Sequence, residues 1–401
     1  MTHDASQKIN QKLDADIIVV GAGLVGLAAA IAFAKQGKTA VLVDSNPAKI
    51  ALPALKKSAA WDARIYALTT ATEDWLKALE AWPGVDTGRV NAIDAMRLWN
   101  ENDQKLELNC KDANLPKLGV IIENQNLMAA LWQQIIALGV TVITDAKCKL
   151  LEHTQHDITL SLEGATKVSA KLIVAADGVN SWVRGQANIA VKKKYFQQTA
   201  IVVNFFAEKN HQNIARQWFA PHATLALLPL PNKHVSMVWS LSTEKADELL
   251  RLSGEELAAK VALQSKHELG TLQAIGKTLS FTLNQQTANA LIAARVVLVG
   301  DAAHQIHPMA GQGVNLGFRD VMQLTSLATK LRTMQDIGEY SFLRQFERAR
   351  KADIASMNTL TTGLDYLFAS DSTMIKKVTN WSLRQLNSQA AIKKILIQQA
   401  A

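Results

Sequence analysis

Residues 15–26 read ADIIVVGAGLVG, and this stretch decides how the chain begins to fold. Its apolar half, residues 17–20, predicts a strand covered on both faces, because Ile and Val run on without alternation. Its glycine-rich half predicts a tight turn into a helix over residues 24–36, where Ala, Leu and Ile recur at helical spacing. A second apolar strand at residues 39–43 completes a βαβ unit, which implies parallel strands and a right-handed crossover.

The glycines of that turn and the acid after the second strand predict a dinucleotide site. Gly21 permits the sharp turn, Gly23 lets the backbone approach a pyrophosphate, and Gly26 lets the helix pack closely on the strand. The helix N-terminus offers free N–H groups and a positive dipole end to phosphate. Asp44 follows the second strand, where a carboxylate accepts hydrogen bonds from ribose hydroxyls. These residues do not distinguish FAD from NAD.

A second nucleotide signal lies far along the chain, where residues 300–315 read GDAAHQIHPMAGQGVN. An apolar strand at residues 296–299 precedes it and a long helical pattern follows. Asp301 is placed to accept from a ribityl or ribose hydroxyl. The helix beginning near Val314 would direct its N–H groups at the pyrimidine edge of a flavin ring. We therefore expect the ring to lie beside Pro308, Gly311, Gln312, Gly313, Val314 and Asn315.

Other residues near these motifs have two interpretations each. His304 and His307 are more consistent with a scaffold for the loop than with acid–base catalysis. Asp177 and Gly178 follow an apolar strand at residues 168–175, and Arg184 lies one helical turn beyond them. They form either a phosphate-proximal site or a well-capped turn without a ligand. Arg64, after a long loop, reaches either a nucleotide or a surface carboxylate.

Composition narrows the class of protein. The chain has 401 residues, of which 48% are hydrophobic, and a net charge of +8. No apolar run reaches the ~18 residues that span a bilayer, and residues 1–15 lack a signal-peptide core, so we expect a cytoplasmic protein. The two cysteines, Cys110 and Cys148, have no metal-ligand spacing, and no metal site is expected. The basic charge comes without a nucleic-acid motif, so nucleic acid is not an expected partner.

The pattern of elements predicts an α/β fold of two domains. Short strands dominate residues 195–241, a helix is expected over residues 246–262, and the chain from Gly311 onward is nearly all helical. A β-rich domain therefore interrupts a Rossmann-like nucleotide-binding domain. We assign residues 1–70, 91–185 and 285–330 to the nucleotide-binding domain, 71–90 and 186–284 to the β-sheet substrate domain, and 331–401 to a C-terminal helical region.

The order of the three motifs, GxGxxG, Asp-Gly and Gly-Asp, resembles that of the single-component (class A) flavoprotein aromatic hydroxylases, which include p-hydroxybenzoate hydroxylase. Several further segments resemble the ubiquinone-biosynthesis hydroxylases within that class. The resemblance extends from about Ala15 to about Phe368, and most of the chain is therefore covered. The segments that carry it are Asp62-x-Arg64-x-x-Ala67-Leu68, Glu123-Asn124, Phe219, Leu227–Leu230, Val238–Ser240, Gly300–Gly317 and Arg319-Asp320.

The resemblance implies a Rossmann-like FAD-binding domain, with FAD as cofactor and NAD(P)H as co-substrate. Gly21, Gly23, Gly26 and Asp44 then match the adenosine-diphosphate site, and Arg64 matches a flavin contact. Asp177 and Gly178 match a motif linked to both FAD and the nicotinamide cofactor, and Asp301 matches the ribityl contact. Two positions depart from the family: Asp44 stands where many relatives carry Glu, and Asn124 where several carry Arg.

The implied reaction is hydroxylation, with O2, of the aromatic ring of a polyprenylated phenol through a C4a-hydroperoxyflavin. Because the flavin carries the chemistry, no side chain is assigned as catalytic. A prenylated phenolic quinone precursor would be the substrate, reached at the inner membrane or within a multi-enzyme quinone-biosynthesis assembly. The alternatives are a hydroxylase of a small soluble phenol and a non-catalytic flavin-binding component. The aromatic residues of the β-rich domain form either a lid over the substrate or ordinary core, and these are Phe205, Phe206, Trp218, Phe219 and Trp239.

Overall fold

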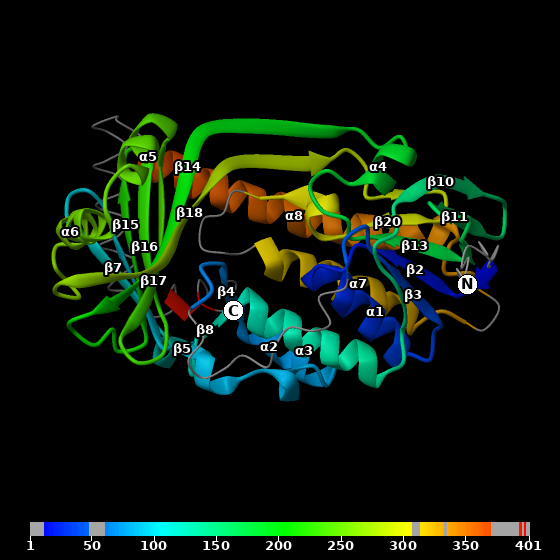
Figure 1. Ribbon diagram of the computed structural model, residues 1–401, viewed down its shortest axis with the longest axis horizontal. Helices are drawn as coiled ribbons and strands as arrows, with labels where there is room; N and C mark the ends of the chain where they lie inside the picture. Colours follow the sequence, from blue (N-terminus) through cyan, green and yellow to red (C-terminus); the bar gives the residue numbers. More distant parts are fainter. Residues whose placement is uncertain are drawn as a thin grey trace, which may run out of the picture.

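The computed structural model describes residues 12–47, 61–306, 313–332, 335–369, 393–394 and 397 (Figure 1). Two large sheets dominate these residues, one at each end of the long axis (Figure 1). A two-stranded ribbon formed by β14 (Val191–Ala207) and β18 (Leu272–Ala288) runs from one end to the other. The predicted fold class, a Rossmann-like domain with an inserted β-rich domain, is confirmed.

The first large sheet has the strand order β19-β20-β13-β2-β3-β9. All its neighbours are parallel except β19 and β20, and the predicted βαβ unit is therefore confirmed. Apolar side chains are buried on both faces, because the core around this sheet contains residues of helices and also Ile158, Leu160 and Val168 of a smaller sheet. The strands are β2 (Ile17–Val20), β3 (Ala40–Val43), β9 (Thr141–Ile143), β13 (Leu172–Ala175), β19 (Ile292–Ala293) and β20 (Val296–Leu298). The helices are α1 (Leu24–Lys35), α3 (Asn124–Ala137), α7 (Gly313–Ala328) and α8 (Tyr340–Ala369).

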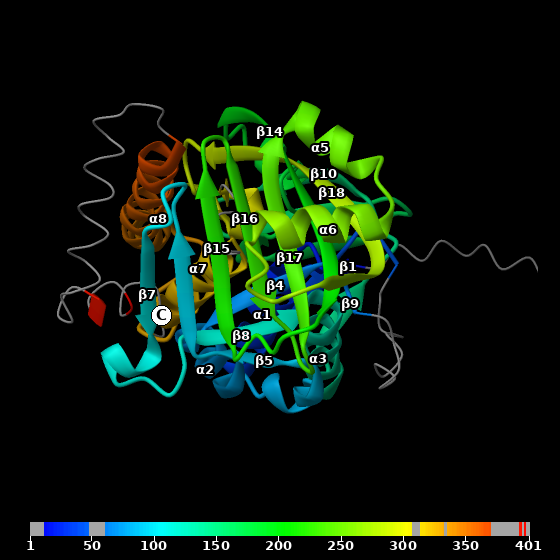
Figure 2. The ribbon, with the colours of Figure 1, turned by 90° about the vertical axis from the view of Figure 1, so that its left-hand side faces the viewer.

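The second large sheet has the order β21-β18-β14-β17-β16-β15-β6-β7 and is antiparallel except where β15 pairs with β6. Figure 2 shows it with α5 (Thr243–Leu250) and α6 (Gly254–Gln264) in front of one face. The single helix predicted over residues 246–262 is wrong, because Ser253 forms a capping box and starts a new helix. The remaining strands are β6 (Ala95–Trp99), β7 (Lys105–Asn109), β15 (Ile214–Ala220), β16 (Ala223–Pro229), β17 (His234–Ser242) and β21 (His304–Gln305).

Two smaller sheets complete the described residues. One contains β4 (Ile65–Thr69), β8 (Gly119–Glu123) and β5 (Asn91–Ile93), and it lies between the large sheets (Figure 1). The other has the order β1-β12-β11-β10, and the apolar run predicted as one strand at residues 168–175 is divided between β12 and β13. Its strands are β1 (Lys12–Asp14), β10 (Cys148–His153), β11 (Ile158–Leu162) and β12 (Lys167–Ala170). Two short helices are α2 (Thr70–Ala78) and α4 (Trp182–Gln186).

Two segments pack in a different domain from the one to which the sequence assigned them. Residues 71–90 were assigned to the β-sheet domain, but Leu76, Leu79 and Val85 are buried in the core of the nucleotide-binding domain. Conversely, β6 and β7 lie within residues 91–185 and are strands of the second large sheet. The parallel pairing of β6 with β15 joins segments far apart in the chain, and local hydrophobic pattern carries no information about such a pairing.

Candidate flavin site

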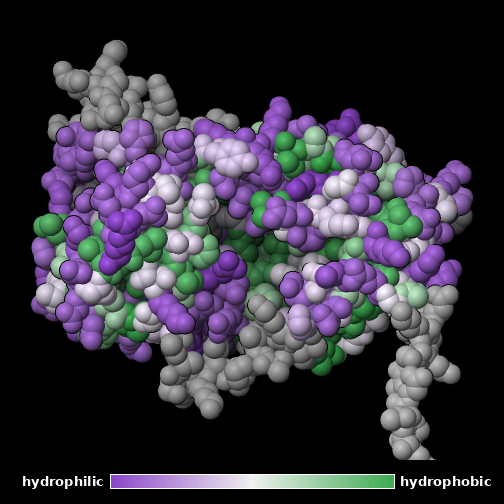
Figure 3. Space-filling model, turned by 45° about the horizontal axis from the view of Figure 1, so that its top comes forward, coloured by the Kyte–Doolittle hydropathy of each residue, from purple (hydrophilic) through white to green (hydrophobic). Residues whose placement is uncertain are grey.

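A cavity of about 1010 Å³ lies between the two large sheets. Its lining comes from the glycine-rich turn, from Asp44, from β4, from the Gly300–Asp301 turn and from the face of the second sheet opposite α5 and α6. Figure 3 shows a hollow with apolar side chains at its base between the two halves of the molecule. Motifs at residues 22–25 and 300–314, far apart in the sequence, thus meet in one continuous space.

The glycine-rich turn has the geometry that a bound pyrophosphate needs. Gly21 has a φ of +106°, which favours glycine, and a Cβ on Gly26 would lie 1.8 Å from the Gly21 carbonyl oxygen. A Cβ on Gly23, which lines the cavity, would meet nothing within 4 Å. The first turn of α1 carries no acidic residue and no side-chain cap, so its N–H groups remain for an anion.

Asp44 links the end of β3 to this turn. One carboxylate oxygen accepts a hydrogen bond from the Ala22 N–H at 2.6 Å, and the other accepts from the Asn46 N–H at 2.7 Å. Asp44 and Asn46 line the cavity, as do Met128 and Trp132 of α3. A carboxylate that follows the second parallel strand suits a ribose.

The Asp177–Gly178 turn offers one unused acceptor. Asp177 Oδ2 accepts from the Val183 N–H at 3.0 Å, whereas Oδ1 is buried and has no hydrogen-bond partner among the described residues. Gly178 lines the cavity. Arg184 donates instead to the carbonyl oxygens of Ala302 and Val179 at 2.8 and 2.9 Å. The interpretation of Arg184 as a phosphate partner is therefore wrong, since its guanidinium binds main chain.

A buried charge network holds the second nucleotide turn in place. Asp320, on α7, accepts hydrogen bonds from the Gly300 N–H at 2.8 Å, from His304 Nε2 at 2.7 Å and from Arg350 Nε at 2.6 Å. His304 is 2% exposed, so it belongs to this scaffold, as predicted, while His307 lies outside the described residues. The network fixes the backbone on either side of Asp301.

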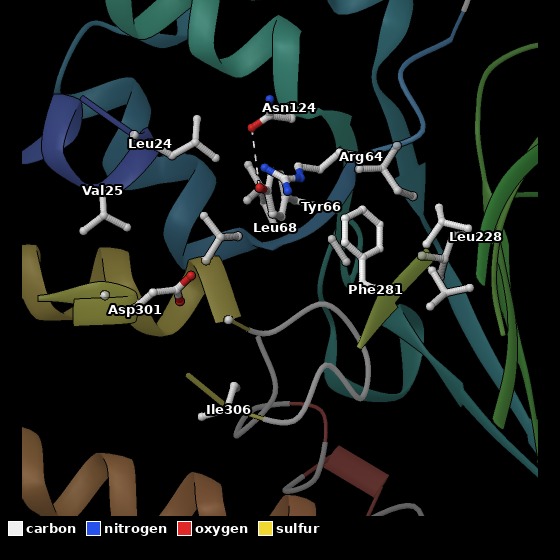
Figure 4. A pocket seen from close by; sticks show the side chains of 18 of the residues that line it. Leu24, Val25, Arg64, Tyr66, Leu68, Asn124, Leu228, Phe281, Asp301 and Ile306 are labelled. Carbon is white, nitrogen blue, oxygen red and sulfur yellow. Dashed lines mark hydrogen bonds between the residues drawn. The ribbon is translucent and has the colours of Figure 1, made fainter. Parts of the chain in front are cut away.

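Asp301 itself faces the cavity (Figure 4). The surrounding protein desolvates its carboxylate and raises the pKa of Asp301 above the ordinary value, while the charges of His304 and Arg64 oppose that rise. The N-terminal residues of α7, Gly313 and Val314, line the cavity next to this turn. A hydrogen-bond acceptor and a helix N-terminus therefore both border the cavity.

The segment carrying Arg64 is held by two carboxylates, the half-buried Asp62 and the buried Glu123. Asp62 Oδ1 accepts from the Arg64 N–H at 2.9 Å, and Asp62 Oδ2 accepts from the Gln125 N–H at 3.2 Å. The Asp62 N–H donates to Glu123 at 2.6 Å, and Glu123 forms a two-bond ion pair with Arg89 at 2.6 and 2.7 Å. These contacts fix the loop from which the Arg64 guanidinium enters the cavity.

Arg64, Tyr66 and Asn124 form a polar group at the centre of the cavity (Figure 4). The Tyr66 hydroxyl donates to Asn124 Oδ1 at 3.4 Å, and the Arg64 guanidinium lies 5.7 Å from the centroid of the Phe281 ring. Burial raises the pKa of Tyr66, although the Arg64 charge opposes the rise. Asn124 therefore places a neutral amide in the cavity, bonded to a neutral phenol.

The predicted site residues fall into three groups. The first lines the cavity and comprises Gly23, Asp44, Arg64, Gly178, Asp301, Gly313 and Val314. The second lies behind the lining and comprises Gly21, Gly26, Asp177 and Asn315. Asn315 is fully buried and ties α7 to β4, because its amide bonds the Thr69 N–H and the Ala67 carbonyl. The third group, Pro308, Gly311 and Gln312, lies outside the described residues.

The face of the second sheet that lines the cavity carries small, apolar and uncharged polar side chains. Gln217, Thr224 and Ser240 supply its amide and hydroxyl groups, which sequence reasoning missed. The proposed aromatic lid is wrong for Phe205, Trp218 and Trp239, which pack on the opposite face beneath α5 and α6. Phe206 and Phe219 are the other two aromatic residues considered for the lid. Phe206 is 40% exposed and its ring makes an edge-on contact with that of His234, whereas Phe219 is buried.

These features define a Rossmann-type protein with a dinucleotide site that opens onto a β-sheet. A family model described as FAD binding domain matches residues 14–358. That span covers most of the chain, and this chain therefore belongs to the FAD binding domain family. FAD is accordingly its cofactor, and the open space at Gly23 and the unused acceptor on Asp177 are consistent with it.

Curated relatives align along nearly their whole length. The chain is 29% identical over 388 residues to the ubiquinone hydroxylase UbiL of Rhodospirillum rubrum, covering 96% of this chain and 89% of that protein. It is 30% identical over 360 residues to 3-demethoxyubiquinol 3-hydroxylase of Escherichia coli, covering 89% and 90%. It is 29% identical over 429 residues to the mitochondrial ubiquinone biosynthesis monooxygenase COQ6 of Mus musculus, covering 94% and 89%.

Solved structures share the fold. The p-nitrophenol 4-monooxygenase PnpA of Pseudomonas putida superimposes with a TM-score of 0.76 and covers 97% of this chain and 98% of that chain. Its sequence identity is 15%, so the likeness concerns the arrangement of the elements alone.

Proposed function

We propose that this protein is an FAD-dependent monooxygenase that hydroxylates the aromatic ring of a polyprenylated phenol in ubiquinone biosynthesis, with NAD(P)H and O2 as co-substrates. The names of the curated relatives support this substrate class. The observation that carries the proposal is that one cavity joins the dinucleotide motifs to a sheet face of small and uncharged side chains. A ring bound against that face would lie next to the residues proposed for the flavin.

The proposed placement of FAD rests on the chemistry of the lining residues. The N-terminus of α1, with Gly23, would hold the pyrophosphate, and Asp44 the adenosine ribose. Asp301 would accept from the ribityl chain, and Arg64 and the start of α7 would lie beside the ring. Gly178, Pro308, Gly311 and Gln312 complete the proposed set.

FAD, when bound, would supply the redox chemistry that links NAD(P)H and O2 to hydroxylation of the ring. The protein would orient the substrate and keep water out of the cavity. Gln217, Thr224 and Ser240 can bond a phenolic hydroxyl, because each presents a donor and an acceptor to the cavity. Burial raises the pKa of Tyr66 further above that of an ordinary phenol, so its hydroxyl stays neutral and keeps its hydrogen bond to Asn124. The apolar lining excludes water that would divert the oxygen.

The test uses purified, FAD-loaded protein with NADH or NADPH, 18O2 and a phenol with a short prenyl chain. One aromatic substrate, one O2, one NAD(P)H and one proton should give one hydroxylated ring, one NAD(P)+ and one water. Mass spectrometry should find a single 18O atom in the product. Oxidation of NAD(P)H that yields only hydrogen peroxide would refute the proposal. Turnover of a soluble phenol but not of a prenylated one would indicate the small-substrate alternative.

We also propose that the protein works at the periphery of a membrane or of a quinone-biosynthesis assembly. No helix among the described residues is both long and apolar enough to cross a bilayer. Exposed basic and aromatic side chains on β14, Lys192, Lys193, Lys194 and the 67% exposed Tyr195, support contact with an anionic surface. Sedimentation with phosphatidylglycerol vesicles should fall when the three lysines are changed to glutamate; unchanged sedimentation would exclude this surface.

A further inference from the structure

Four residues that lie in one row across the second sheet line the cavity, and all four side chains are apolar. Leu108 on β7 lies opposite Met96 on β6, and Met96 lies opposite Ala215 on β15. The register of β15 and β16 brings Leu228 beside Ala215. Residues opposite one another on neighbouring strands project from the same face. All four line the cavity, and the row crosses three strand spacings, about 14 Å at ~4.8 Å each.

The neighbouring row on the same face is different in character. Gln217 lies opposite Ala226, and Ala226 opposite Val238, so that row contains an amide. Thr224 and Ser240 face one another in the next row and present two hydroxyls. The cavity face is therefore divided into a region that can bond a polar ring substituent and a region that offers none.

The apolar row has an apolar wall facing it. Ile93 of β5 and Leu118, next to β8, line the cavity, and both belong to the hydrophobic cluster that also contains Ala215, Met96 and Leu228. Met96, Leu108, Leu118 and Leu228 are nevertheless only half-buried, and all four border the cavity. Apolar side chains on both walls favour a hydrocarbon over water between them.

A residue close to the C-terminus also takes part in this lining. Ile397 is 2% exposed and lines the cavity. Lys393, four residues earlier in the sequence, lies 3.9 Å from Asp112, in the short helical turn that follows β7. The described residues of the C-terminal segment are therefore anchored beside the strand that ends the apolar row.

We infer that the space between the apolar row and Ile93–Leu118 binds the hydrocarbon chain of the substrate, and that Ile397 closes its outer end. This inference rests on the proposed function, which supplies an aromatic ring bearing such a chain. The polar rows then hold the ring, and the apolar row directs the chain away from the flavin residues toward the β7 edge. Leu108 and Ile397 become determinants of specificity for chain-bearing phenols.

The test compares two ligands, an unsubstituted phenol and the same phenol carrying a geranyl chain, on the FAD-loaded protein. Binding is measured by titration calorimetry, which does not depend on turnover. Leu108→Asn and Ile397→Asn place an amide in the apolar space, and Lys105→Asn on the exposed side of β7 is the matched control. FAD content and thermal midpoint identify any variant that does not fold, and Leu108→Ala then replaces Leu108→Asn.

We expect each test variant to weaken binding of the geranyl phenol about tenfold, equivalent to about 1.4 kcal/mol, and to leave the unsubstituted phenol unchanged. Wild-type binding of the geranyl phenol should also show the more negative heat-capacity change. Equal loss for both ligands, or no loss for either, would overturn the inference. If chain-dependent binding follows this pattern but no hydroxylated product forms, the subsite stands and the proposed function fails.

Discussion

Replacing each of two glycines in one turn by alanine should have different effects: one substitution should lower the stability of the fold, and the other should lower the affinity for FAD. A Cβ on Gly26 would lie 1.8 Å from the Gly21 carbonyl oxygen, and the turn must open until the two atoms are about 3.0 Å apart. Because the obstacle is backbone, we expect a loss of about 3 kcal/mol in the free energy of unfolding, at the upper end for overpacking. Gly26→Ala should therefore destabilise the FAD-free protein.

Gly23→Ala should leave the FAD-free protein nearly unchanged. Gly23 has an extended backbone, with φ −76° and ψ 179°, and a Cβ would meet nothing within 4 Å. Restriction of the unfolded chain favours alanine by about 0.4–1 kcal/mol, while alanine is a poorer N-cap by a similar amount. The new methyl group would, however, occupy the space through which a phosphate reaches the N–H groups of α1. We expect FAD affinity to fall at least about tenfold.

The assay has two parts. Urea unfolding of the FAD-free protein, followed by tryptophan fluorescence, measures stability, and quenching of FAD fluorescence on titration measures affinity. The reasoning fails if Gly23→Ala binds FAD as wild type does, since the backbone would then make no close approach. It fails equally if Gly26→Ala is as stable as wild type without FAD.

Three further predictions concern charged groups. Glu123→Gln leaves the buried Arg89 without its carboxylate and should cost about 3–5 kcal/mol in urea unfolding; a cost below about 1 kcal/mol would contradict the role given to this pair. Burial alone would raise the pKa of Asp336, but Arg295 and a backbone N–H lower it below its ordinary value. Its ionised form therefore stabilises the fold above the unfolded pKa of about 3.9, and this stabilisation is lost as the pH falls through the lower folded pKa. Asp336→Asn should flatten the decline of the thermal midpoint with acid below about pH 4, and an unaltered decline would contradict this. Asp301→Asn should weaken FAD binding by about 1.5 kcal/mol or more, and full retention of affinity in the same titration would remove Asp301 from the site.

Features carried by consecutive residues could be predicted from the sequence. The strand, glycine turn and helix of residues 17–35 depend on local periodicity and on backbone angles that few residues adopt, and the structure contains all three. The scaffold role of His304 also followed, since it lies in a loop between a strand and a helix. The parallel first sheet is a consequence of the same short-range pattern.

The face of the second sheet that lines the cavity could not be predicted in the same way. Alternation along β15 and β17 identifies two faces but not which of them α5 and α6 cover, and so Trp218 and Trp239 were considered as lid residues when they are core. Ser253 was missed as a helix start, although the Ser253–Glu256 capping box is visible in the sequence.

The sequence by itself determined the cofactor class and the local geometry of its motifs, because glycine angles and strand–helix periodicity act between near neighbours. Only the tertiary structure decided what meets in the cavity. Arg64 is positioned by hydrogen bonds that run through Asp62 and Glu123 to Arg89. The apolar row brings Leu108 and Met96 beside Ala215 and Leu228. The physical reason is that long-range strand pairing brings these residues together, and no local propensity encodes a partner more than 100 residues away.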